Sequence, residues 1–224
     1  MAVSIRTDEA IQADVLEELQ WDTRVQPNEI GVAVKDGVVT LTSWVDSYLK
    51  KIAAQEAAHR VRGVKAVVND IEVRLPSSAE RTDADLVAAV INALKWDAAI
   101  PADTLDVKVS QGWVTLKGEV DHGFQKRNAL RAICRLSGVK GITNLMMVKP
   151  RVLPTDLKQQ IGRALLRNAQ TDARNITVEM EGGKVILRGT VRSYAEKQAA
   201  EDTACWSAPG VTEVDNRIVV SPIP

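Results

Sequence analysis

The sequence predicts an α/β (α+β) fold of three tandem small modules, each with the order helix–strand–strand–helix–strand. The first observation is a glycine between two alternating apolar runs, which recurs at shifts of 75 and 71 residues, at Gly37, Gly112 and Gly183. The second is an asparagine that follows each glycine by 32 or 33 residues, at Asn69, Asn144 and Asn216. A unit that recurs in tandem carries its own folding information. We therefore predict modules at residues 1–76, 82–150 and 153–224.

Each module is predicted to begin with an amphipathic helix. Apolar residues are spaced four apart in all three copies, at Ile11, Val15 and Leu19, at Leu86, Val90 and Leu94, and at Leu157, Ile161 and Leu165. Thr82, with Asp85 three residues later, is typical of a capped helix start, and Thr155 is the corresponding candidate in the third module. Strict alternation then predicts a half-buried first strand at residues 30–34, 105–109 and 176–180.

The recurring glycine is predicted to form a two-residue hairpin turn, because such turns need positive φ and glycine adopts it without steric cost. The second strand follows at residues 39–45, 114–120 and 185–191. A small residue falls on the inward side of each of these strands, at Ser43, Gly118 and Gly189. We expect it to allow the close approach of a helix.

An alanine-rich second helix is predicted next. Glycines typical of a left-handed helix end follow it, at Gly63, Gly138 and Gly210. The last strand covers residues 67–73, 142–148 and 214–220. Each module is thus predicted to be a three-stranded mixed sheet with both helices on its apolar face. The connectors, residues 76–81 and 150–154, are short and contain proline, which predicts restricted movement between modules.

Composition and cysteine usage indicate a cytoplasmic protein. The chain holds 29 basic and 29 acidic residues, so its net charge provides no overall attraction for nucleic acid or membranes. Cys134 and Cys205 occupy the same position of two modules, so we expect no disulfide within a module. Residues 1–14 lack the apolar core of a secretory signal, and no apolar run approaches the ~20 residues that span a bilayer. A peripheral position at the inner membrane is compatible with this expectation.

The sequence contains no recognisable catalytic or metal-binding pattern. His59 and His122 have no serine or cysteine partner at a known motif spacing, and no cluster has the spacing of metal ligands. His59 stands at the position that Cys134 and Cys205 occupy in the other modules, beside the buried stripe of the second helix. We therefore expect a protein that is not an enzyme and that uses no metal or cofactor.

The recurring asparagines share the inward side of the last strand with its apolar residues. We expect a half-buried amide at this position to satisfy backbone groups of a loop or a helix end. The alternative is a carbonyl ligand for a cation, which would need several further oxygens.

The second helix of the second module has arginines at a spacing of four, which predicts one exposed basic stripe. With two nearby lysines, the candidate contact for anionic lipid or another partner consists of Lys126, Arg127, Arg131, Arg135 and Lys140. Like charges at this spacing repel each other, and an anionic partner would relieve the repulsion. Each basic residue near an anionic leaflet contributes about 1 kcal/mol. The alternative is a solvated face that the first module, with 9 basic and 12 acidic residues, partly neutralises.

The sheet face away from the helices, called the open face below, is predicted to be partly apolar. The alternation of the strands places on it Val38, Trp44, Val68, Trp113, Leu145, Met147, Ile186 and Val219. Exposed apolar patches usually mark contact surfaces. We expect four of these residues to pack between modules or between chains of a homo-oligomer, with lipid insertion as the alternative: Trp44, Trp113, Leu145 and Met147. Trp21 and Trp96 end two of the first helices and are expected to cap the local cores.

These motifs resemble the BON domain, a module of bacterial envelope and osmotic-stress proteins. The resemblance lies in the hairpin glycine with the strand after it, at residues 36–43, 112–118 and 183–189, and in the closing segments 63–71, 138–144 and 210–218. It implies a helix-backed mixed sheet, no known catalysis and a role in phospholipid binding at membranes. The resemblance also makes potassium a candidate ligand, because potassium binding has been attributed to a BON-containing protein.

We therefore expect a non-catalytic binding protein that associates with anionic phospholipid or an envelope-facing partner during osmotic or general stress. We expect it to bind no nucleic acid. Two alternatives stay open. One is a cytoplasmic sensor of a small ligand or ion, with potassium as the first candidate, and the other is an oligomeric scaffold.

Overall fold

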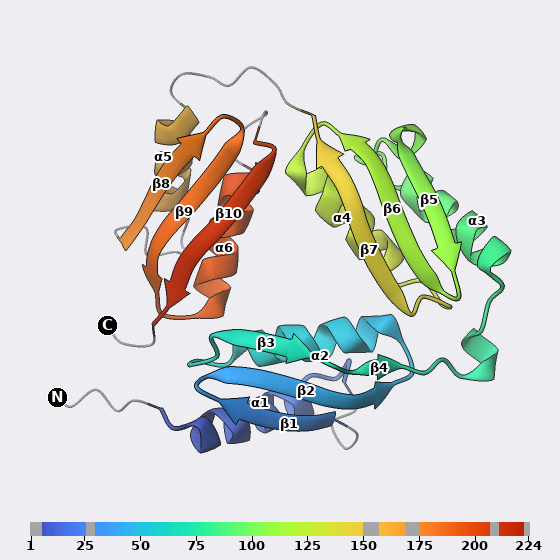
Figure 1. The fold of residues 1–224 in the computed structure, drawn as a ribbon, viewed down its shortest axis with the longest axis horizontal. Coiled ribbons are helices and arrows are strands. Elements are labelled where there is room, and N and C mark those ends of the chain that lie inside the picture. Colours follow the sequence, from blue (N-terminus) through green and yellow to red (C-terminus); the bar gives the residue numbers. More distant parts are fainter. Residues whose placement is uncertain (1–5, 26–29, 150–156, 169–174, 207–210, 222–224) are drawn as a thin grey trace.

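The computed structural model describes residues 6–25, 30–149, 157–168, 175–206 and 211–221. Within these ranges the chain forms three mixed sheets, each with helices on one face. Figure 1 shows the three units placed around a common centre. The predicted α/β fold class and the repeated order of elements are confirmed.

The elements recur in the same order in each module. The first module contains α1 (Asp8–Trp21), β1 (Ile30–Lys35), β2 (Val38–Val45), α2 (Tyr48–Arg60), β3 (Ala66–Asn69) and β4 (Glu72–Val73). After the 3-10 turn η2 (Ser77–Ala79), the second contains α3 (Asp83–Trp96), η3 (Ala102–Thr104), β5 (Leu105–Ser110), β6 (Trp113–Val120), α4 (Gly123–Ile133) and β7 (Gly141–Val148). The third contains α5 (Leu157–Arg167), β8 (Ile176–Glu181), β9 (Lys184–Val191), α6 (Tyr194–Trp206) and β10 (Glu213–Val220).

The second strand lies at the centre of each sheet. It pairs antiparallel with the hairpin strand before it, as β1–β2, β5–β6 and β8–β9. It pairs parallel with the last strand, as β2–β3, β6–β7 and β9–β10. A parallel partner needs a crossover connection, which the second helix supplies. The first module differs because its last strand is interrupted at Asp70 and Ile71, which divides it into β3 and β4.

Each module has its own cluster of buried apolar side chains. The predicted apolar positions of the first helices are all buried, at Ile11, Val15, Leu19, Leu86, Val90, Leu94, Leu157, Ile161 and Leu165. The hydroxyl of Thr82 accepts a hydrogen bond from the Asp85 N–H at 3.1 Å, which confirms this helix cap. Thr155 lies outside the described residues.

The hairpin turns are stabilised by a contact that the sequence analysis missed. Asp36 and Gly37 have the expected positive φ of 53° and 78°, and the corresponding turn of the second module is similar. The carboxylate of Asp8 accepts hydrogen bonds from both of these backbone N–H groups, at 2.7 and 2.9 Å. Asp83 does the same in the second module, at 2.8 and 3.0 Å. The start of the first helix is thus fastened to the hairpin by a single side chain.

The second strand needs a small residue at this position for a different reason from the one predicted. Gly118 and Gly189 both have φ of 139°. A Cβ at Gly118 would overlap the carbonyl oxygen of Thr104, and a Cβ at Gly189 would overlap that of Asn175. These neighbours are backbone atoms at the start of the adjacent strand. The expectation of a closely approaching helix is therefore wrong at both glycines.

Two of the glycines that follow the second helices have the predicted positive φ. Gly63 and Gly138 have φ of 98° and 96°. The helices themselves stop earlier, at Arg60 and Ile133. Gly210 lies outside the described residues.

The modules meet through their second helices, and the contacts form a closed ring. Helix α6 contacts both α2 and α4 near the centre of Figure 1. The first residue of each second helix lies against one equivalent position of the next module. The pairs are Tyr48 with Cys134, Gly123 with Cys205, and Tyr194 with His59. The cyclic order is first to second, second to third and third to first, so the modules that are not adjacent in sequence also meet.

Candidate functional site

The open face of the second module carries three half-exposed apolar side chains. Trp113 on β6 is 51% exposed, and Leu145 and Met147 on β7 are 53% and 61% exposed. They share this face because β6 and β7 pair in register, with Trp113 opposite Gly141 and Lys117 opposite Leu145. The result is an apolar column along the outer strand β7, with the indole at one end.

The Trp113 ring lies across the neighbouring strand. Its Nε1–H donates a hydrogen bond to Thr143 Oγ1 at 2.8 Å. A Cβ at Gly141 would clash with the ring, so glycine allows the indole to lie over β7. The side chain of Lys140 lies beside Gly112 at the same end of the sheet. An apolar ring and a lysine are therefore presented together.

Charged side chains share the remainder of this open face. Lys108 and Asp106 on β5 and Lys117 and Glu119 on β6 are all exposed. Their charges cancel in number, and Lys140 adds a positive charge at the end where Trp113 lies. The face is thus an apolar column beside mixed charges with a slight positive excess.

The open face of the third module is covered by ion pairs. Arg188 pairs with Glu179 at 3.1 Å, Arg217 pairs with Asp215 at 2.8 Å, and Lys184 contacts both Glu213 and Asp215 at 2.9 and 3.2 Å. Among these charged groups, Ile186 is only 3% exposed. Val219 remains 62% exposed. In this module most outward side chains are charged, and their opposite charges are paired with one another.

The first module is intermediate between the other two. Trp44 is 38% exposed, and the Arg74 guanidinium lies 5.8 Å from its ring centroid. Val68 is 43% exposed on the same face. A cation over the indole covers part of the apolar surface that the second module leaves open.

The open-face residues do not pack between modules in the described part of the chain. Trp44, Trp113, Leu145 and Met147 remain 38–61% exposed, while the second helices make the contacts between modules. The inter-module part of that prediction is wrong because the open faces point away from the helices that converge at the centre (Figure 1). Contact with a second chain stays a prediction.

The predicted basic stripe on α4 is wrong at two of its arginines. The Arg127 side chain is only 22% exposed and forms an ion pair with Asp202 of α6, and burial lowers its pKa. Arg135 lies beyond the end of α4 at Ile133. The neutralising carboxylate also comes from the third module, not from the first. The exposure of the other candidates is partial at Lys126 and greater at Arg131, Arg135 and Lys140.

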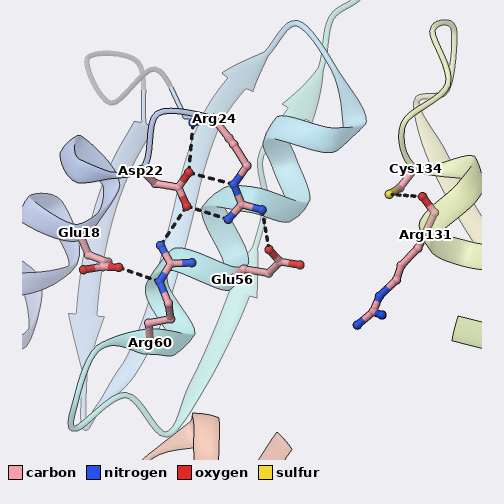
Figure 2. A network of polar contacts seen from close by, with 7 residues as sticks. All are labelled: Glu18, Asp22, Arg24, Glu56, Arg60, Arg131 and Cys134. Atoms are coloured by element: carbon pink, nitrogen blue, oxygen red, sulfur yellow. Dashed lines mark hydrogen bonds and ion pairs between the residues drawn. The ribbon is translucent and has the colours of Figure 1, made fainter. Parts of the chain in front are cut away.

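A network of ion pairs in the first module faces Arg131 (Figure 2). Arg24 pairs with Asp22 at 2.8 Å and Glu56 at 3.0 Å, and Arg60 pairs with Asp22 at 2.9 Å. Hydrogen bonds from Arg24 hold the pKa of Asp22 well below its usual range. The network fastens the end of α1 to α2, while Arg131 extends toward it from the second module.

Two of the recurring asparagines link the last strand to the second helix. Each Nδ2 group donates to a helix carbonyl oxygen at 3.0 Å and to a side-chain oxygen at 3.1 Å. The contacts are Asn69 with Lys51 and Gln55, and Asn216 with Lys197 and Glu201. Each Oδ1 also accepts from a backbone N–H two residues later, at 3.3 and 3.2 Å. Both amides are thus engaged in contacts within their own module.

Asn144 differs from the other two asparagines. Its Oδ1 accepts from the Met146 N–H at 3.0 Å. Leu130 stands where the other modules have Gln55 and Glu201, so no side-chain oxygen is available to its amide nitrogen at that position. Asn144 is accordingly exposed.

The half-buried thiols are not suited to nucleophilic chemistry. Burial raises the pKa of the Cys134 and Cys205 thiols, and the thiolate is the reactive form. Within the described ranges, no group of three or more histidines, cysteines and carboxylates could hold a metal ion. No helix in the part of the chain that the structure describes is long and apolar enough to cross a bilayer.

The tryptophans that end two first helices are solvent-exposed. Trp21 is 84% exposed and Trp96 is 93% exposed. The expectation that they cap the local cores is wrong, because both side chains lie beyond the buried stripe of their helices.

A signal for the ion pairs on the open face of the third module was present in the sequence, because alternate positions of its strands are charged with opposite signs.

Comparison with known proteins agrees with the repeated architecture. A model of the BON domain matches residues 7–74, 82–150 and 155–222. Osmotically-inducible protein Y of Escherichia coli (strain K12) is 27% identical over 146 residues, which are 63% of this chain and 73% of that protein. Two solved structures of CdsD, a structural protein of the type III secretion system of Chlamydia trachomatis, are 12% identical over 94% of this chain and over 96% and 92% of theirs. Their TM-scores are 0.25 and 0.27.

The family assignment rests on the three matches, because they cover nearly the whole chain and each contains one of the three sheets. The structural likeness is too low to add to it. The protein therefore belongs to the BON-domain family, as a chain with three tandem BON domains.

Proposed function

We propose that this protein is a non-catalytic binding protein of osmotic or general stress, which associates peripherally with anionic phospholipid through the open face of its second module. The observation that carries the proposal is the exposure of Trp113, Leu145 and Met147, each more than half exposed on one face. Exposed apolar patches with a polar rim commonly mark contacts with membranes or other proteins.

The energetics favour a weak and reversible attachment. Burying the exposed half of each of the three apolar side chains would contribute about 1 kcal/mol per residue. Lys117 and Lys140 beside the column would each add about 1 kcal/mol near an anionic leaflet. Asp106 and Glu119 on the same face oppose part of this attraction. Such a surface binds through insertion of the indole and side chains, with a modest preference for anionic lipid.

The sheet replaces helix α4 as the proposed lipid contact. Using the whole basic stripe would require breaking the partly buried pair between Arg127 and Asp202. Removing one partner of a desolvated pair leaves an uncompensated charge, which is costly. The open face needs no such rearrangement, because its apolar side chains are already exposed.

Vesicle co-sedimentation tests the proposal. The loss variant combines Trp113→Ser and Leu145→Ser, which removes apolar surface without changing the charge. The matched control is Val219→Ser, because Val219 is 62% exposed on the open face of the third module. We expect wild type and the control to sediment with phosphatidylglycerol vesicles, and the double variant to bind at least about tenfold more weakly.

Two results would count against this function. Equal sedimentation of the double variant and wild type would exclude the open face as the contact. Absence of sedimentation, together with a dimer in light scattering that the double variant abolishes, would assign the face to a second copy of the chain instead.

A further inference from the structure

The contact between the third and first modules closes the ring without help from sequence adjacency. The Tyr194 ring at the start of α6 stacks on the His59 ring of α2, with centroids 3.7 Å apart and an angle of 12° between the planes. The two other interfaces have Cys134 and Cys205 at the position of His59. Only the closing interface therefore has a side chain there that titrates between pH 5 and 8.

The surroundings of His59 disfavour a positive charge. Among the described residues, its Nδ1 atom is buried and has no hydrogen-bond partner. A cavity of about 470 Å³ lies next to the ring, lined by charged or titratable groups from three helices. These are Glu56 and Arg60 from α2, Tyr194 and Asp202 from α6, and Arg127 and Arg131 from α4.

The two carboxylates of this cavity are already paired with arginines. Arg24 holds Glu56 at 3.0 Å, and Arg127 holds Asp202. Arg60 is engaged by Glu18 at 2.7 Å as well as by Asp22 (Figure 2). An imidazolium at His59 would thus be added to three guanidinium groups without a free carboxylate beside it. Such a charge is costly in a partly desolvated interface.

We propose that the contact between His59 and Tyr194 is a pH-sensitive latch, which holds the third module against the first when the imidazole is neutral and releases it in acid.

Linkage gives the direction and size of the effect. Burial lowers the pKa of His59 from 6.5 to about 4 in the closed ring. A depressed histidine pKa means that closure is at full strength above pH 6.5 and is lost as the pH falls toward 4. These two pKa values alone would weaken closure about thirtyfold at pH 5 relative to pH 8. Solvent reaches part of the ring, so we expect about a tenfold effect.

NMR titration of the His59 imidazole in the full chain tests the latch. His122→Gln distinguishes the two histidine signals. We expect the wild-type His59 signal to titrate below pH 5.5. In Tyr194→Ala, which removes the stacking partner, it should move back toward 6.5. Coupling is reciprocal, so a pKa that depends on closure requires a closure that depends on pH.

A second variant guards against a folding defect, because Tyr194 also contacts the core of its own module. Ala195→Gln places a larger, uncharged side chain in the same interface at an exposed position and leaves the core unchanged. It should raise the His59 pKa as Tyr194→Ala does, with an unchanged circular dichroism spectrum. A wild-type midpoint near 6.5 would overturn the proposal. So would a depressed pKa that persists in both interface variants.

Discussion

The second and third modules have the same fold and register, but the open face of the second is apolar where that of the third is charged. Trp113 and Leu145 of the second module correspond to Lys184 and Arg217 of the third. The first pair is half exposed and apolar, whereas the second pair is engaged by carboxylates within the sheet. The inward residues are apolar in both modules, because both must close a core. Binding function is therefore expected to reside in the outward half of the strand alternation, where folding imposes little.

The largest expected effect tests the shared part of this comparison. Gly118→Ala and Gly189→Ala should each lower the free energy of unfolding by about 3 kcal/mol. The reason is that both glycines have φ of 139° and that a Cβ would meet a neighbouring carbonyl oxygen. Urea unfolding measures the loss. A loss below about 1 kcal/mol in either module would show that the modules do not depend on the same backbone feature.

A transplant of the open face should have the next largest effect. In the background of Trp113→Ser and Leu145→Ser, four substitutions copy the second module onto the third: Lys184→Trp, Glu213→Gly, Asp215→Thr and Arg217→Leu. Together they remove the ion pairs of Lys184 and Arg217 and create an exposed apolar column. We expect vesicle affinity to recover by about tenfold in co-sedimentation. No recovery would mean that the position of the second module, and not its surface chemistry, determines binding.

The smallest expected effect concerns the ion pairs themselves. A hydrogen bond from Arg217, supported by Lys184, lowers the pKa of Asp215. A depressed carboxyl pKa adds stability above the unfolded value of 3.8 and loses it as the pH falls through the folded pKa. Asp215→Asn should therefore lower the thermal midpoint slightly at pH 7, and the difference from wild type should shrink below pH 3.8.

Salt provides the control for that prediction. Arg217 is exposed and Asp215 is only partly covered, so 1 M NaCl should remove most of the difference between Asp215→Asn and wild type. Vesicle binding should not change, because Asp215 lies outside the proposed lipid contact. A difference that survives high salt would indicate a packing role for Asp215 instead.

The buried side of each module could be predicted from the sequence because the residue patterns that specify it are local. The burial of Val15, Val90 and Ile161 follows from the four-residue spacing of apolar residues in each first helix. The positive φ of Gly37 follows from short-range steric rules. The hairpin contact of Asp8 bridges 28 or 29 residues and has no comparable local signal. Helix and strand patterns therefore gave the fold without the contacts that fasten it.

The candidate site could be predicted only in part because exposure depends on how modules meet. The alternation placed Trp113, Leu145 and Met147 on the open face, where the structure has them. The same reasoning treated Arg127 as exposed, although Asp202 of another module covers it. No pattern within one module reports such a partner 75 residues away.

Tryptophan quenching by brominated phosphatidylglycerol vesicles tests the central claim most directly. If the open face of the second module inserts into lipid, the bromines should quench wild-type emission, and Trp113→Phe should lose most of that quenching while binding nearly as well. Equal quenching of wild type and Trp113→Phe would contradict the claim, because the indole of the second module would then lie away from the membrane.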